Sequence, residues 1–224
     1  MIELKNVTKY FHTHEGRKYI LQDVSLVLPN VNIGILGRNG SGKSTLMRML
    51  GKIEFPNRGQ IVSSSSFSWP LALGGGFVGT MTGKANVKFV CRLYGKNRAE
   101  TNEIITFVKE FTELEEYFHM PIKTYSTGMR ARLGFGLSLA FDFDYLLIDE
   151  TLSVGDINFR NKAYNALRKK LESCHTLLVS HHMKVLSELC QEGILLHEGK
   201  LYYYDKINDA IRHYQSLNQN QESR

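Results

Sequence analysis

Gly37-Arg-Asn-Gly-Ser-Gly-Lys43-Ser44 dictates the fold class of this chain. The eight residues match the P-loop pattern, in which a glycine, four residues and a second glycine lead into lysine and serine or threonine. Glycines let the backbone amides of such a loop turn inward onto phosphate groups. An apolar run from Val31 to Leu36 precedes the loop, and Thr45 to Leu50 has helical composition. Strand, glycine loop and helix in this order predict one half of a parallel α/β unit that binds a nucleotide.

The residues of this loop have distinct expected roles toward ATP and Mg²⁺. Lys43 supplies a positive charge to the β and γ phosphates, and the Ser44 hydroxyl is a ligand for Mg²⁺. The helix that follows adds the positive end of its dipole. We expect the nucleotide-binding residues to be Gly37, Arg38, Asn39, Gly40, Ser41, Gly42, Lys43, Ser44 and Thr45.

A second pattern is an apolar run that ends in two acids, Tyr145-Leu-Leu-Ile-Asp149-Glu150. Ligands of open α/β sheets bind at the carboxyl ends of the strands. Asp149 is therefore expected to hold the Mg²⁺ shell, and Glu150 to take a proton from attacking water. Alone, such a run is more often a plain strand or helix end, and the P-loop upstream is what favours a site.

A third pattern, Tyr125-Ser126-Thr127-Gly128-Met129, comes just before a predicted helix. Ser126 suits the N-cap position, and a capped helix alone would explain it. The alternative is a second phosphate-binding turn made by the serine hydroxyl, the glycine amides and the helix end. Its position before Asp149, with one helix between, places it away from its own P-loop and favours this alternative.

Composition excludes several classes of protein. Of the 224 residues, 42% are hydrophobic and 22% are charged, as in globular domains rather than disordered chains. No apolar run approaches the roughly 20 residues of a membrane span, and no apolar leader follows Met1. Three scattered cysteines are typical of reduced, buried thiols in a cytosolic protein. The net charge of +6 permits anionic partners, but the basic residues are dispersed, so we expect no nucleic-acid partner.

The chain changes character twice along its length. Strand patterns dominate the first part, with Val24 to Leu28 as one expected strand, and helical periodicity takes over from Thr82 to about Phe143. We expect one domain with an α/β core at 1–79 and 145–204. A helical subdomain is expected at 80–144, and a helix and tail at 205–224.

The order of these motifs, with Val179-Ser180-His181 after a later strand, resembles that of ATP-binding cassette (ABC) ATPases over nearly the whole chain. Ser68-Trp-Pro70, Leu73-Gly-Gly-Gly-Phe77 and Lys123-Thr-Tyr-Ser-Thr-Gly-Met-Arg130 resemble the ATPase subunits of bacterial capsular polysaccharide exporters. The resemblance implies a P-loop NTPase (RecA-like) core with an antiparallel β subdomain and a helical insertion.

The resemblance also implies residue roles in a homodimer. Ser126, Thr127 and Gly128 of one copy would contact the γ-phosphate that is held by the other copy's P-loop. His181 would contact the same phosphate, and Asp156 would lie in the loop that crosses the dimer seam.

Two further positions follow from the resemblance. Phe11, with Tyr10 as second choice, would stack on adenine, although simple strand packing is the alternative. The family often has glutamine where this chain has Val78, and valine offers no side-chain oxygen to Mg²⁺ or water. Either the metal keeps a water there, or hydrolysis is slower, or the register of the resemblance differs by a few residues.

The implied function is ATP hydrolysis that powers export of a lipid-linked capsular polysaccharide. The partners would be a second copy of the chain and separate integral-membrane permease subunits, at the cytoplasmic face of the bacterial inner membrane. One alternative is another cargo, O-antigen or teichoic acid. Another is a soluble cassette ATPase that acts on ribosomes or nucleic acid, which only the charge of +6 supports.

Overall fold

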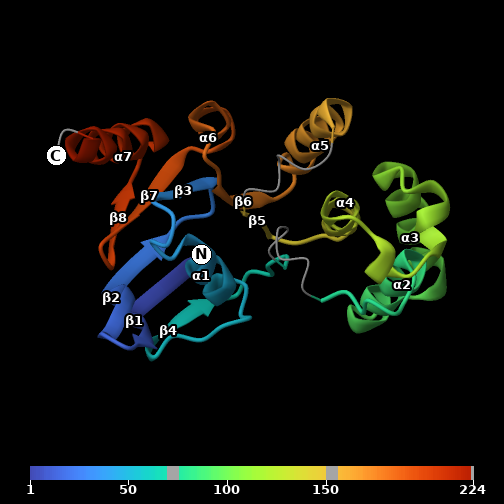
Figure 1. Cartoon of the computed structure of the whole chain (residues 1–224), viewed down its shortest axis with the longest axis horizontal. Helices are drawn as coiled ribbons and strands as arrows, with labels where there is room; N and C mark the ends of the chain where they lie inside the picture. Colours follow the sequence, from blue (N-terminus) through green and yellow to red (C-terminus); the bar gives the residue numbers. More distant parts are fainter. Residues whose placement is uncertain (70–75, 150–155, 223–224) are drawn as a thin grey trace. The chain divides into compact units, whose positions relative to one another are not determined.

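The structure is a computed structural model that describes residues 1–69, 76–149 and 156–222 (Figure 1). Internal contacts divide the chain into two compact units. The described part of the first unit is 1–69, 143–149 and 174–222, and that of the second is 76–142 and 156–173. The domain boundaries expected at residues 80, 145 and 205 stay predictions.

The first unit contains a three-stranded antiparallel sheet. Its order is β2-β1-β4, with β1 at Ile2–Thr13, β2 at Gly16–Leu28 and β4 at Arg58–Ser63. Ile2 and Leu4 alternate with more exposed neighbours and are buried, as expected for a sheet with one face on the core.

The second sheet of this unit has the order β5-β6-β3-β7-β8. The first four of these strands are parallel, and β8 is antiparallel to β7. Every residue of β3 and β5 is buried, because helices or the other sheet cover both faces of a mostly parallel sheet. The bounds are Ile33–Gly37 for β3, Tyr145–Asp149 for β5, His175–Val179 for β6, Glu192–His197 for β7 and Lys200–Tyr204 for β8.

Helix α1, Lys43–Leu50, joins the two sheets of the first unit through one hydrophobic core. Helices α6, Met183–Leu189, and α7, Ile207–Glu222, belong to the same unit. Gly193 of β7 allows α7 to approach, since a Cβ atom there would lie 2.5 Å from Cβ of Ala210. The small residue therefore sets how closely α7 packs on the sheet.

The second unit is helical. Phe111 is at its centre, with its ring stacked on Phe107 and Phe135 and edge-on to Phe159. The elements are α2 (Gly83–Leu93), α3 (Arg98–Thr112), η1 (Glu115–His119), η2 (Ile122–Thr124), α4 (Thr127–Leu139) and α5 (Ile157–Lys170).

The expected fold class is confirmed: an α/β core, an antiparallel sheet and a group of helices are all present. One strand is longer than its apolar pattern indicates, since β2 begins at Gly16 rather than near Val24. Pairing with β1 holds the polar part of β2 in the sheet. Within the described residues, no helix combines the length and the apolar character that a bilayer span requires.

Candidate functional site

The P-loop connects the end of β3 to the start of α1. Gly42 is the N-cap of α1 and has φ of 104°, and Gly40 has φ of 79°. A Cβ atom on Gly42 would lie only 2.1 Å from Cγ2 of Ile20. Positive φ and this close approach both require glycine, so the loop takes a shape that leaves its backbone amides available.

Lys43 is the first residue of α1 and is only 8% exposed. Its Nζ atom donates hydrogen bonds to the carbonyl oxygens of Gly37, at 2.7 Å, and Arg38, at 3.1 Å. The ammonium group therefore lies over the loop, where it adds to the positive end of the α1 dipole. This arrangement favours a bound anion.

An open cavity of about 300 Å³ lies over the loop. The Ser41 hydroxyl lies instead against Gly37, where an added Cβ atom would be 2.5 Å from Oγ, and it has no hydrogen-bond partner among the described residues. The buried Lys43 ammonium group and the N-terminus of α1, both at this cavity, fit a phosphate-bearing ligand. The residues that line the cavity are Ile20, Asn39, Gly40, Gly42, Lys43, Ser44 and Thr45.

Asp149 ends β5 at the same edge of the sheet as the P-loop. It pairs across the ladder with Val179 of β6, which in turn pairs with Ile35 of β3. With a spacing of about 4.8 Å between strands, the backbone of Asp149 lies roughly 10 Å from that of Ile35. Asp149 is 7% exposed. His181 follows β6 at this edge, whereas Glu150 lies outside the described residues.

The two aromatic candidates for adenine stacking lie on opposite faces of the antiparallel sheet. Phe11 pairs with Lys18, whose Nζ atom is 3.9 Å from the position of a Cβ atom on Gly40 of the P-loop. Tyr10 instead pairs with Tyr19, with 5.5 Å between the ring centroids. Directly paired residues share a face and neighbours along a strand do not. Phe11 is therefore on the P-loop face.

Two residues of this face were missed from the sequence. Ile20 lines the P-loop cavity and Lys18 approaches Gly40, although both belong to β2, far from the loop in sequence. The packing of β2 against the P-loop places them here, and no local motif marks them.

Ser126 is the N-cap of α4 in the helical unit. Its hydroxyl accepts a hydrogen bond from the Met129 amide at 3.2 Å. Ser126 and Thr127 are exposed and Gly128 is half-buried. The structure therefore contains the capped helix, with the first turn accessible to a ligand.

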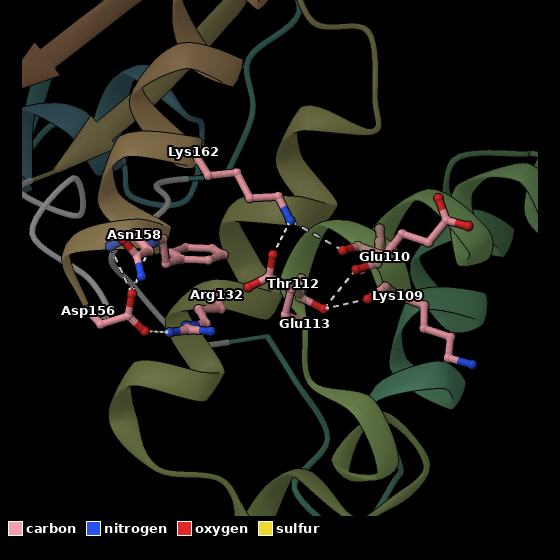
Figure 2. Close-up of polar contacts among 10 residues, drawn as sticks. Lys109, Glu110, Thr112, Glu113, Arg132, Asp156, Asn158 and Lys162 are labelled. Atoms are coloured by element: carbon pink, nitrogen blue, oxygen red, sulfur yellow. Dashed lines mark hydrogen bonds and ion pairs between the residues drawn. The ribbon is translucent and has the colours of Figure 1, made fainter.

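Asp156 caps α5 and pairs with Arg132 of α4 (Figure 2). Its carboxylate accepts hydrogen bonds from the amides of Asn158 and Phe159, and its distance to the Arg132 guanidinium is 2.7 Å. The Phe159 amide, together with Arg132, holds the pKa of Asp156 below its ordinary value. Sequence reasoning did not identify Arg132, because nothing local relates it to Asp156.

The comparisons with known proteins agree with this geometry. Residues 21–153 match the ABC transporter family. This chain belongs to the ABC transporter family. As an ABC ATPase domain it binds ATP, and the predicted membership of the family is confirmed.

Three relatives illustrate the relationship. The polysialic acid transport ATP-binding protein KpsT of Escherichia coli is 48% identical over 96% of this chain and 98% of its own length. The capsule polysaccharide export ATP-binding protein CtrD of Neisseria meningitidis serogroup B is 40% identical over 97% of this chain and 100% of its own. The teichoic acids export ATP-binding protein TagH of Staphylococcus saprophyticus is 36% identical over 96% of this chain and 81% of its own.

Among solved structures, the dimeric ATP-binding cassette MJ0796 bound to ADP and Pi matches with a TM-score of 0.76. It is 23% identical, over 92% of this chain and 99% of that chain. This likeness shows that the chain has the fold of an ATP-binding cassette.

Val78, at the position where the resemblance implied a glutamine, is held by Asn86 of α2. The Val78 amide donates to Oδ1 of Asn86 at 2.8 Å, and Nδ2 of Asn86 donates to the carbonyl oxygens of Val78 and Thr82. Asn86 is 1% exposed, so these hydrogen bonds hold the turn firmly before α2. The Val78 side chain is 41% exposed.

Proposed function

We propose that this chain is the ATP-binding and ATP-hydrolysing subunit that powers export of capsular polysaccharide through a separate permease. The observation that carries this proposal is the end-to-end similarity to KpsT, at 48% identity over 98% of that protein. The teichoic acids export relative is less similar, at 36%. The cavity lined by Lys43 and other P-loop residues supports the proposal, because such a subunit would bind ATP there.

Lys43 and the amides of the P-loop would bind the β and γ phosphates of ATP. Ser44 and Asp149 would hold Mg²⁺, which supplies charge neutralisation at the phosphates. Among the described residues no cluster of three acidic, histidine or cysteine side chains exists. One carboxylate and one hydroxyl suit Mg²⁺, because this ion usually keeps waters and takes phosphate oxygens as further ligands.

Glu150 would accept a proton from the water that attacks the γ-phosphate, in line with the leaving group. His181, at the same edge of the sheet, would contact that phosphate. Phe11 would stack on adenine, since it shares a face with Lys18 over the loop.

A second copy of the chain would complete each ATP site. Ser126, Thr127 and Gly128 at the accessible start of α4 would bind the γ-phosphate in the partner's P-loop, and Asp156 would lie at the seam. The two copies would close on ATP, and the loss of the γ-phosphate would let them reopen. This motion would be passed to integral-membrane permease subunits that move the lipid-linked polysaccharide, at the cytoplasmic face of the inner membrane.

Deletion of the gene tests the proposal. We expect capsular polymer to accumulate inside the cell and to disappear from the surface, and a plasmid copy to restore export. Complementation with Lys43→Ala should fail, whereas the exposed Lys88→Ala should succeed. Normal surface capsule in the deletion strain, with loss of O-antigen or teichoic acid instead, would overturn the assigned cargo.

A further inference from the structure

A second cavity, of about 440 Å³, lies on the antiparallel sheet β2-β1-β4. Tyr10 and Tyr19 line it. Their strand neighbours Phe11 and Lys18 point to the other face, toward the P-loop. The cavity is therefore on the opposite face of this sheet from the ATP site, and none of the roles proposed above uses it.

Bulges in β1 and β2, and a glycine of positive φ in β4, lie at the hollow. Asn6 of β1, Asp23 of β2 and Gly59 of β4 have φ of 48°, 49° and 75°. The pairing register shifts beside Asn6 in both ladders of β1. A Cβ atom on Gly59 would lie 2.3 Å from the carbonyl oxygens of Lys5 and Asn6, so only glycine fits. Bulges and positive φ values concentrate where a sheet is shaped for function.

Side-chain hydrogen bonds hold the polar floor of the hollow. Nδ2 of Asn6 donates to Oδ1 of Asp23 at 3.2 Å, and the Asp23 amide donates to Oγ1 of Thr8 at 3.0 Å. The carboxylate of Asp23 therefore accepts a hydrogen bond from the side-chain amide of Asn6 rather than pairing with a cation. The floor is ordered before any ligand arrives, which lowers the cost of binding.

Two arginines bring positive charge to the cavity. Arg17 and Arg58 both line it, and neither forms an ion pair or a hydrogen bond through its side chain within the described parts of the chain. The Arg17 guanidinium lies 4.6 Å from the centroid of the Tyr10 ring, and Tyr10 packs against Tyr19. Stacking restricts the guanidinium to one orientation while its N–H groups stay available.

We infer that this cavity binds a small acidic saccharide, with its carboxylate or phosphate on Arg17 and Arg58 and its ring against Tyr19. Guanidinium groups bind such anions through paired hydrogen bonds, and Tyr19, at 37% exposure, offers an apolar ring to a sugar face. The inference that an anion binds here depends only on the cavity and its two arginines. That its natural ligand is a unit of the exported polymer rests on the proposed function.

Nuclear magnetic resonance titration of the full-length ¹⁵N-labelled chain tests the inference. The probes are N-acetylneuraminic acid, glucose 1-phosphate, neutral N-acetylglucosamine and inorganic phosphate. We expect saturable shifts of the amides around Tyr10, Arg17 and Arg58 with both acidic sugars. Neutral sugar should bind at least tenfold more weakly.

The double variant R17Q/R58Q should reduce the affinity for acidic sugars at least tenfold and leave ATP binding unchanged. The matched control R98Q/R160Q removes two exposed arginines from the helical unit. It should change neither the affinity for acidic sugars nor ATP binding. Inorganic phosphate that binds as tightly as the acidic sugars would overturn the saccharide class. Unchanged binding in R17Q/R58Q would overturn the site.

The two proposals fail in different ways. If ATP hydrolysis and capsule export stand while no acidic sugar binds, the cavity assignment is wrong and the proposed function is not affected. If acidic sugars bind here but the deletion strain exports capsule normally, the function is wrong and the site stands.

Discussion

The Lys43 side chain is 8% exposed, and its Nζ atom donates to two loop carbonyl oxygens. Bound phosphate would give this ammonium group a charged acceptor in place of neutral ones. A hydrogen bond to a charged group contributes about 1.5 to 3 kcal/mol. We therefore expect Lys43→Ala to weaken ATP binding roughly 10- to 100-fold. Titration with a fluorescent ATP analogue measures this, with Lys88→Ala as control, and retained affinity would contradict the role of the loop.

The faces of β1 give a second prediction at the scale of single residues. Phe11 lies on the P-loop face and Tyr10 on the opposite face. Stacking on a base contributes about 1 to 3 kcal/mol, so Phe11→Ala should weaken ATP binding at least roughly fivefold. Tyr10→Ala should leave it unchanged in the same titration. If the two results were exchanged, adenine would stack on the other face.

At the scale of elements, the second unit is held together by ion pairs between its helices as well as by aromatic packing. Figure 2 shows that Lys162 of α5 points toward the carboxylate of Glu113, which comes just after α3. The distance between Lys162 Nζ and the carboxylate is 2.5 Å. Arg132 of α4 reaches Asp156 at the start of α5. Both contacts end on α5, so this helix is linked to α3 and α4 at separate points.

The cap of α5 predicts a pH dependence. Because the pKa of Asp156 is lowered in the folded chain, the carboxylate stabilises the fold above the unfolded pKa of about 3.9. This contribution is lost as the pH falls through the lower, folded pKa. We expect Asp156→Asn to be less stable than wild type at pH 6, and the difference to shrink toward pH 3. Urea unfolding at several pH values measures it, and a difference independent of pH would contradict the carboxylate's role.

The packing of α7 on β7 gives a prediction about stability. A Cβ atom on Gly193 would lie 2.5 Å from Cβ of Ala210, and neither atom can rotate away. Overpacking of this kind costs about 1 to 3 kcal/mol. We expect Gly193→Ala to lower the free energy of unfolding by about 1 to 3 kcal/mol, as measured by urea denaturation. The control Gly79→Ala, whose nearest neighbour would be 3.9 Å away, should be near wild type.

At the scale of the whole molecule, the proposed mechanism depends on two copies that close on ATP. Glu150→Gln removes the proposed base but keeps a side chain of the same size. We expect this variant to bind ATP, to hydrolyse it at least 100-fold more slowly and to accumulate as a dimer. Sedimentation with ATP, and with ADP as control, measures the dimer. Wild-type turnover in Glu150→Gln would remove Glu150 from the role of base.

Much of this protein follows from local sequence alone. The P-loop, the acidic end of β5 and the serine cap of α4 each depend on neighbouring residues, through glycine conformations, a buried strand and a capping hydroxyl. Interactions between residues that are close in sequence produce patterns that can be recognised without a structure. The fold class and the family were predictable for the same reason.

Tertiary structure decided what depends on register and on contacts between distant segments. Phe11 rather than Tyr10 faces the P-loop because bulges shift the pairing of β1 with β2. Arg132 pairs with Asp156, and Arg17 and Arg58 share a cavity, across 24 and 41 positions of the chain respectively. One residue of slip in a strand exchanges its two faces, and Arg132 and Asp156 belong to two different helices. No local pattern could therefore have determined these groupings.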